Sequence, residues 1–462
     1  DFKVGDSVSA RLWLMADHAT RDDKGPSAGS PVAGLQGARN PLTGAWMPFE
    51  SFSSAAPYTA TALTPSTSEV YTRSGQANLL KFDELHFKND YASEHTLGGG
   101  ITSTTIAGLS ANYQRLIWKN WTATATPVDF ANLAATEDYN PASTVYGLNK
   151  DKAGEQTDLQ VFGYQRFGFL DNRLILAGGA SEFWGQLART DDSNLPVTTA
   201  PNARTISNSV TDANLGAIYK VMKGVSLFLG YNRVGGALPT SILAGEVPKN
   251  FLIQVGDQVE GGVKTSLLDG RLNLSASYFD IKQNNFQVAN SAFITDPTQP
   301  QFLFYDLKST GEEIEVNTLL TRELALVGNY THLHMRDAYG IPQRSVPDNA
   351  GALFAKYTFA DGDLKGLGFS LGLDYKDKMP GDQTSGVTAA STPGHLIVNQ
   401  PSFWVASRTI LSAGVSYKHA NWEAAVLVDN VTNKDYIEAT LSRTTIYPGL
   451  PRSWSARFTY NF

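Results

Sequence analysis

Segments with alternating apolar and polar residues occur along most of this chain, and the connections between them alternate between short and long. Within residues 211–221, for example, Leu215 would face one side of a strand and Asn214 the other, because successive side chains of a strand point to opposite faces. The short connections carry the Gly, Asn and Asp residues of tight hairpin turns. This combination predicts an all-β chain of consecutive antiparallel hairpins.

The pattern predicts sixteen strands and two classes of connection. The strands span about residues 7–18, 81–93, 95–118, 156–169, 173–189, 211–221, 225–234, 257–268, 271–288, 304–320, 323–336, 349–359, 366–377, 405–418, 422–430 and 453–462. The tight connections include 171–172, 222–224, 269–270, 321–322 and 420–421, and the long ones 19–80, 119–155, 190–210, 378–404 and 431–452.

Segregation of long and short connections predicts a membrane barrel, since outer-membrane barrels have short periplasmic turns and long extracellular loops. A barrel in lipid must close, because an open sheet edge in hydrocarbon leaves backbone groups without partners. The apolar face would then meet lipid, at Leu215, Leu227, Leu371 and Phe458. A soluble sandwich or propeller is the alternative, although no blade-length repeat is present.

The composition of the chain argues against several classes of structure and function. The chain has 462 residues, of which 18% are charged and 11% aromatic, with 41 glycines. The longest run of apolar residues and glycine, 174–180, is far shorter than the roughly 20 residues of a spanning helix. Zero cysteines exclude disulfides and thiolate chemistry. A net charge of −7 without a basic run argues against nucleic-acid binding.

Several short stretches resemble the TonB-dependent outer-membrane receptors, especially the ferric-siderophore branch. They are VEGGVK at 259–264, LDGRL at 268–272, YFDI at 278–281, STGEEIE at 309–315, GNYT at 328–331, DNVTNKDY at 429–436 and PGLPR at 448–452. The aromatic last strand, which ends in Phe462, also resembles the signal of barrel assembly. Departures are Val431-Thr432-Asn433 in place of the usual Leu-Phe-Asp, and Ser412 in place of a common aspartate.

The resemblance implies a barrel of 22 strands preceded by a globular plug and an energy-coupling segment. Residues 1–462 show neither of these segments, and the chain begins at Asp1 without a signal peptide. We therefore expect the whole chain to be a receptor-like barrel that lacks its plug and first strands. A smaller barrel without a plug is the alternative, since sixteen is an even number that could close.

The expected binding site is an aromatic vestibule at the extracellular end. Aromatic faces with a few polar groups suit a bulky chelate, and Arg408 is a further polar candidate. The vestibule candidates are Trp118, Trp121, Tyr139, Tyr305, Arg336, Tyr339, Phe403 and Trp404. Structural roles in loops or at the membrane interface are the alternative for many of them.

Lumen-facing charges and one histidine pair complete the candidate sites. Glu260, Lys264, Glu313 and Glu315 would face a plug, as the resemblance implies, or would form charge pairs in a wet interior. His332 and His334 share one strand face, which makes a metal site geometrically possible but only weakly favoured.

The resemblance implies a receptor of the Gram-negative outer membrane that imports a ferric siderophore or a similar chelate. Its partners would be outer-membrane lipid, the chelate, and a TonB-type protein that acts through the plug. We expect no enzymatic activity and no cofactor, with iron only as part of the transported chelate. A passive porin is the alternative function, and it would show an open lumen lined by opposed charges.

Overall fold

The computed structural model describes residues 2–5, 8–31, 37–39, 46–48, 50–52, 60–62, 70–129, 145–191, 203–236, 252–289, 302–338, 340–381, 401, 403–442 and 445–460. Nearly all of these residues are β-strand, and the single helical element among them is the 3-10 turn η1 (Gly98–Gly100). No helix in the described part of the chain is long and apolar enough to cross a membrane.

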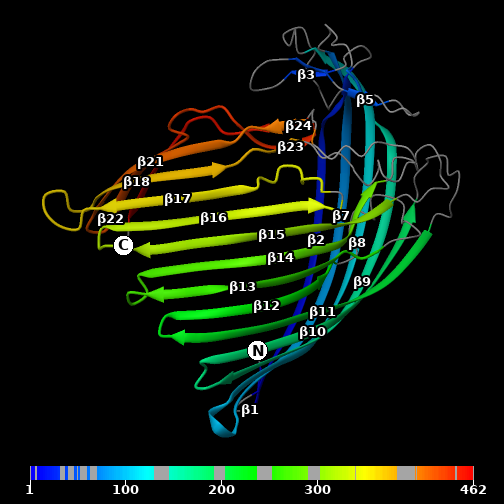
Figure 1. The fold of residues 1–462 in the computed structure, drawn as a ribbon. Helices are drawn as coiled ribbons and strands as arrows, with labels where there is room; N and C mark the ends of the chain where they lie inside the picture. The colour runs from blue at the N-terminus through cyan, green and yellow to red at the C-terminus, as the bar shows by residue number, and fades with distance from the viewer. Residues whose placement is uncertain are drawn as a thin grey trace.

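Seventeen strands form one antiparallel sheet, and each strand pairs with its neighbours in the sequence (Figure 1). They are β1 (Phe2–Gly5), β2 (Val8–Pro31), β7 (Val70–Thr96), β8 (Thr102–Asp129), β9 (Gly147–Phe169), β10 (Leu174–Asp191), β11 (Ala203–Met222), β12 (Val225–Gly235), β13 (Val255–Leu267), β14 (Leu272–Ala289), β15 (Phe302–Leu319), β16 (Leu324–Asp337), β17 (Asn349–Thr358), β18 (Leu367–Lys376), β21 (Arg408–His419), β22 (Trp422–Asp429) and β25 (Ser453–Tyr460).

Four two-stranded pairs lie in the long connections. They are β3 (Gly37–Arg39) with β4 (Trp46–Pro48), β5 (Glu50–Phe52) with β6 (Ala60–Ala62), β19 (Met379–Pro380) with β20 (Trp404–Val405), and β23 (Ile437–Ser442) with β24 (Thr445–Pro448).

All the tight connections lie at one end of the sheet, as predicted. Leu268 and Asp269 adopt left-handed backbone with Gly270, and Ala420 does so between β21 and β22. Gly224 has a φ of 78°, and a Cβ there would lie 2.3 Å from the carbonyl oxygen of Ser266. Only glycine suits this turn, because any other side chain would meet backbone that cannot move aside.

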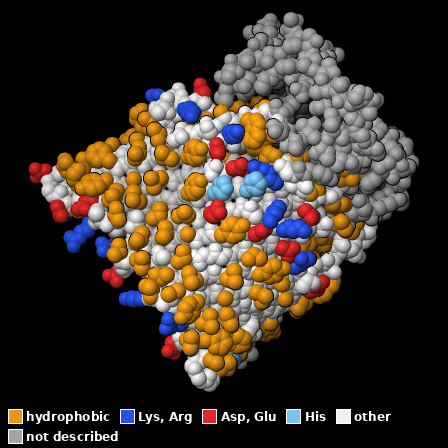
Figure 2. Space-filling model, in the orientation of Figure 1, with side chains coloured by type: hydrophobic (Ala, Val, Ile, Leu, Met, Phe, Trp, Pro, Cys, Tyr) orange, Lys and Arg blue, Asp and Glu red, His pale blue; other side chains and the backbone are white. Residues whose placement is uncertain are grey.

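The cross-strand register separates the side chains into an apolar and a polar face. Leu215 lies opposite Tyr231, which shares its strand face with Leu227, and Leu371 lies opposite Ala413. The large hydrophobic side chains that remain exposed lie mostly on this face, and Figure 2 shows them in rows across it. The sheet curves away behind the apolar face in Figure 1, so this face is the outer one. An apolar surface of this extent is typical of a barrel wall in lipid.

The sixteen predicted strands all occur, and the first ones are longer than predicted. β2 continues to Pro31 and β7 begins at Val70, so much of the predicted loop 19–80 is strand. Residues such as Asp22 and Gly25 carry no apolar alternation, and they form strand only because β7 pairs with them. β1 was not predicted, because its four residues are too few for a pattern.

The sheet has two edges without a partner strand among the described residues. β25 pairs only with β22, and the short β1 pairs only with residues 8–10 of β2. Four consecutive side chains of β2, which point alternately to the two faces of the sheet, are 49–73% exposed. They are Leu12, Trp13, Leu14 and Met15. The described strands of this chain therefore do not close by pairing β25 with β2.

Candidate functional site

The inner, polar face carries the four predicted lumen charges. Glu313 and Glu315 lie on β15 opposite Ser277 and Ser275, and Ser275 donates a hydrogen bond of 3.2 Å to Glu315. On β13, Gln258 donates to Glu260 at 3.1 Å, and the Lys264 ammonium lies 5.0 Å from the Phe228 ring centre. All four side chains thus point toward the concave side.

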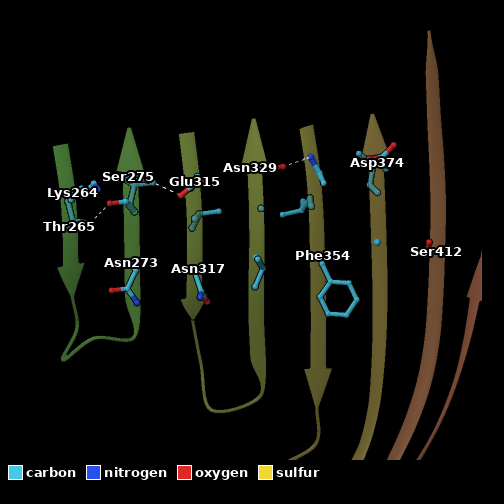
Figure 3. A pocket seen from close by; sticks show the side chains of 18 of the residues that line it. Lys264, Thr265, Asn273, Ser275, Glu315, Asn317, Asn329, Phe354, Asp374 and Ser412 are labelled. Carbon is cyan, nitrogen blue, oxygen red and sulfur yellow. Dashed lines mark hydrogen bonds between the residues drawn. The ribbon is translucent and has the colours of Figure 1, made fainter. Parts of the chain in front are cut away.

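A hollow of about 770 Å³ lies along this inner wall (Figure 3). Its lining mixes polar and apolar residues. Amides, hydroxyls and carboxylates come from strands between β13 and β22, including Asn273, Ser275, Glu315, Asn317, Asn329, Asp374, Ser412 and Asp429, and apolar side chains such as Val327, Phe354 and Leu427 lie among them. Such a wall offers hydrogen bonds at several points along its length. It suits a polypeptide or a polar ligand that passes along the lumen.

Three long connections pack together at the end opposite the tight turns. Met379, Val405 and Ile437 form a small buried cluster, against which Phe403 packs. Thr440 is 2% exposed, and its hydroxyl donates to the carbonyl of Gly381 at 2.6 Å. We call the described parts of 340–348, 377–407 and 430–452 the extracellular cap.

Ser345 ties the first of these connections to the other two. Its hydroxyl donates to the carbonyl of Thr440 at 3.0 Å and accepts from the amide of Thr440 at 3.1 Å. Its own amide donates to the carbonyl of Pro380 at 2.9 Å. One side chain thereby holds three segments of the cap that are distant in the sequence.

An ion-pair network around the buried Arg408 joins the cap to the barrel rim. Arg408 is 6% exposed and donates to Asp374 at 3.0 Å and to Glu438 at 2.6 Å, and its guanidinium lies 4.5 Å from the Tyr436 ring centre. Lys376 also donates to Glu438, at 2.8 Å. Burial works to raise the pKa of Glu438, but the hydrogen bond from Lys376 and the charge of Arg408 outweigh it and lower that pKa.

Three of the predicted vestibule residues lie on the inner face or in the cap beside it. Trp118 is on the inner face of β8 and donates to Asn78 at 3.3 Å. Tyr305 is buried, with its ring 5.2 Å from Phe286 in an edge-on contact. Phe403 packs in the cap.

The other predicted vestibule residues do not join this group. Trp121 follows Trp118 by three positions and therefore lies on the opposite, outer face of β8. Arg336 also lies on the outer face, where it forms two hydrogen bonds with Asp348 at 2.9 and 3.0 Å. Trp404 is 44% exposed, beneath the Lys378 ammonium. Tyr139 and Tyr339 lie outside the described residues.

His332 and His334 are exposed on the outer face of β16. His332 lies opposite Glu312 and its Nδ1 is 2.9 Å from the side-chain oxygen of Asn349. No group of three or more His, Asp or Glu side chains suited to a metal ion occurs in the part of the chain that the structure describes.

Residues 16–431 match the family described as "TonB dependent receptor-like, beta-barrel". The chain belongs to this family. Receptors of the family lie in the outer membrane of Gram-negative bacteria, which assigns the chain to that membrane. The family consists of transport receptors rather than enzymes.

Individual members of the family are similar to this chain over part of their own length. The metal-pseudopaline receptor CntO of Pseudomonas aeruginosa is 28% identical over 258 residues, which cover 54% of this chain and 33% of that protein. The ferrioxamine B receptor of Salmonella typhimurium is 25% identical over 325 residues, or 68% of this chain and 42% of that protein. The chain thus spans about a third to two-fifths of these curated relatives.

Solved structures of receptors share the fold. The ferripyoverdine receptor of Pseudomonas aeruginosa, bound to ferripyoverdine, superposes with a TM-score of 0.72 at 20% identity, over 100% of this chain and 64% of that one. The ferric-catecholate import receptor Fiu of Escherichia coli has a TM-score of 0.71 at 15% identity, over 99% of this chain and 62% of that one.

Two asparagines of the receptor-like stretch 429–436 have structural roles. Asn430 is 2% exposed with a φ of 49°, and its amide group donates to the carbonyls of Lys434 and Leu450. Asn433 accepts from the backbone amide of Arg452 at 2.9 Å. Both fix the start of the last connection before β25. Sequence reasoning missed Glu438 and Thr440, because long loops carry no periodic signal.

Proposed function

We propose that the complete protein is an outer-membrane receptor that captures a ferric siderophore or a similar metal chelate and imports it. The observation that carries this proposal is the family match over residues 16–431. The printed names of the relatives supply the class of ligand, since they are receptors for metal-pseudopaline and ferrioxamine B. Iron would be cargo within the chelate, and we propose neither a resident cofactor nor an enzymatic activity.

The chain is, in this proposal, the larger part of a barrel that also contains a plug and further strands. The relatives are two to three times longer than the matched segment. The unpaired edges of β2 and β25 support the proposal as well, because in lipid each of them needs a partner strand. An intact mass of the native protein well above 50.0 kDa is expected, whereas a mass near that value would favour a small barrel without a plug.

Lipid of the outer membrane would cover the apolar face, and a TonB-type partner would act through the plug. Glu260, Lys264, Glu313 and Glu315 would face the plug across the lumen. The extracellular mouth would hold the chelate with Trp118 and Phe403 among its aromatic groups. These roles rest on family membership and on the placement of the side chains.

Fluorescence quenching tests chelate capture by the complete receptor. Iron-loaded chelates of the hydroxamate and catecholate classes are titrated against the receptor, with the iron-free forms as the reference. We expect saturable quenching by one iron-loaded class, and a smaller signal in Trp118→Phe. Trp184→Phe is the matched control, because Trp184 is 45% exposed on the outer face of β10.

A passive porin would give a different result. Steady ion conductance through the complete protein in a planar bilayer, with no saturable chelate binding, would contradict the receptor proposal. A pore that stays closed while the chelate binds would support the receptor proposal.

A further inference from the structure

Two cations converge on one carboxylate where the cap meets the barrel rim. The Lys376 ammonium donates to one oxygen of Glu438 at 2.8 Å, and the Arg408 guanidinium donates to the other oxygen at 2.6 Å. Arg408 also donates to Asp374 at 3.0 Å. Because two cations and two carboxylates meet here, departure of the Glu438 side chain would leave an excess of one positive charge. We call Arg408 and Lys376 the cationic pair.

The cationic pair lies on the inner face, at the extracellular end of the hollow of about 770 Å³. Lys376 follows Asp374 by two residues on β18, so both side chains are on the same face of the sheet. Arg408 lies opposite Lys376 on β21, four residues before Ser412. Asp374 and Ser412 line the hollow, and Figure 3 shows Asp374 near the end away from the tight turns. A ligand that moves from the cap into the hollow therefore passes the cationic pair.

The Arg408 guanidinium is fixed in place, but its hydrogen bonding is incomplete. Asp374 holds it from one side, and the Tyr436 ring, whose centre is 4.5 Å away, holds it independently of Glu438. Its Nε atom is buried and has no hydrogen-bond partner in the part of the chain that the structure describes. Glu438 accepts from Nη2, while its other oxygen is engaged by Lys376. An oxyanion that accepts from Nε and Nη2 together would form the two parallel hydrogen bonds that a guanidinium favours.

The Glu438 side chain can leave the cationic pair without movement of the cap. It is 44% exposed, whereas the Arg408 side chain is 6% exposed. Ile437 and Thr440 are buried and hold the hairpin of β23 and β24 in the cap. A rotation about the side-chain bonds of Glu438 is therefore enough to free the two cations.

We propose that the cationic pair binds a carboxylate of the chelate, and that Glu438 fills this site until the chelate displaces it. This inference rests on the proposed function, and it narrows the ligand to chelates that carry a free carboxylate besides the groups that hold the metal. The incoming carboxylate accepts hydrogen bonds from Nε and Nη2 of Arg408 and from the Lys376 ammonium. Glu438 then turns toward solvent, where water hydrates its charge. The exchange conserves the charge around the cationic pair, because one carboxylate replaces another.

Binding of matched chelates to the complete receptor tests this exchange. The probes are ferric trihydroxamate and ferric tris-catecholate complexes, each prepared with one pendant carboxylate and as the corresponding methyl ester. Quenching of receptor fluorescence gives the dissociation constants. Glu438→Gln should bind the carboxylate form about fivefold or more tightly than the wild type, because the competing anion is gone, and its affinity for the ester should stay unchanged. Glu438→Ala, which removes the competing side chain, should bind the carboxylate form at least as tightly as Glu438→Gln.

Two further variants separate binding from structure. Lys376→Gln should weaken binding of the carboxylate form about fivefold or more and leave binding of the ester unchanged. Glu312→Gln is the matched control for the loss of a carboxylate, since Glu312 lies opposite His332 on the outer face of the barrel. It should change neither dissociation constant.

The outcomes separate this inference from the proposed function. Saturable chelate binding with an equal effect of Glu438→Gln on the carboxylate and the ester, or with no effect, would overturn the exchange while the receptor proposal stands. Weaker binding of the carboxylate form by both Glu438 variants would also overturn it, because Glu438 would then contact the chelate instead of competing with it. If neither class of chelate binds the wild type, both the proposed function and this inference fail. Selective tightening for the carboxylate form supports the exchange.

Discussion

Arginine at position 215 should destabilise the barrel far more than arginine at position 214. Leu215 is 63% exposed on the apolar face of β11, opposite Gly178 and Tyr231. The strand ends at Met222, seven residues further on, which at about 3.3 Å per residue and a tilt of about 45° is roughly 16 Å from the turn. The apolar band of such barrels is about 25 Å tall, so Leu215 lies near its middle.

The expected cost follows from this depth. Arginine near the midplane of an outer-membrane barrel costs about 2–4 kcal/mol, which lowers the ratio of folded to unfolded protein about 30- to 700-fold. Asn214 lies on the inner face, in line with Asp212 two residues earlier. An arginine there stays in the polar lumen, so Asn214→Arg should cost less than about 1 kcal/mol.

Denaturant unfolding of the complete receptor in lipid vesicles, followed by tryptophan fluorescence, measures both changes. Leu215→Ala separates the loss of the apolar side chain from the burial of the charge. Equal costs for the two arginine variants, or a larger cost at position 214, would refute the assignment of the apolar face to lipid.

Three further predictions concern single turns and the extracellular cap. Gly224→Ala should cost about 1–2 kcal/mol in the same unfolding assay because of its left-handed backbone and the nearby Ser266 carbonyl, whereas Gly163→Ala, where a Cβ meets no neighbour, should be nearly neutral. Thr440→Val removes hydrogen bonds that join the cap segments, so the rate of amide hydrogen exchange within 430–452 should rise about fivefold or more. An unchanged rate would contradict the idea that the cap segments are stabilised cooperatively. The pKa of Glu438 is lowered when folded, so its stabilising contribution is complete above its ordinary value of 4.5 and is lost as pH falls through the lowered pKa. The protection of cap amides, taken relative to their intrinsic exchange rate at each pH, should therefore fall in that acid range in the wild type but stay constant in Glu438→Gln.

The strands with clear alternation were predictable, whereas the first strands were not. Residues 211–221 and 366–377 carry an apolar residue at every second position, and the structure has strands at both places. The bounds of β18 are almost those predicted, whereas β11 begins at Ala203, eight residues before the predicted start. Residues 19–31 lack this pattern, and their strand depends on hydrogen bonds to β7, a segment about fifty residues away. Local periodicity cannot report a pairing that a distant strand imposes.

Some residues of the candidate site were likewise predictable from the sequence, and others were not. Alternation placed Glu260, Lys264, Glu313 and Glu315 on one face correctly, because the face of a strand residue follows from its position alone. It could not assign Trp118 and Trp121 to faces relative to each other, because the predicted strand 95–118 ended at Trp118 and Trp121 fell in the predicted loop 119–155. Once β8 is known to continue through both, their spacing of three puts them on opposite faces.

The sequence by itself determined the architecture of alternating turns and loops, the two faces of the wall, and the family, because each depends on neighbouring residues or short motifs. Tertiary structure decided the rest. The pairing of Arg408 with Glu438 joins residues from different strands and loops. The open edges of β2 and β25 likewise follow from pairing between whole strands, which no local pattern contains.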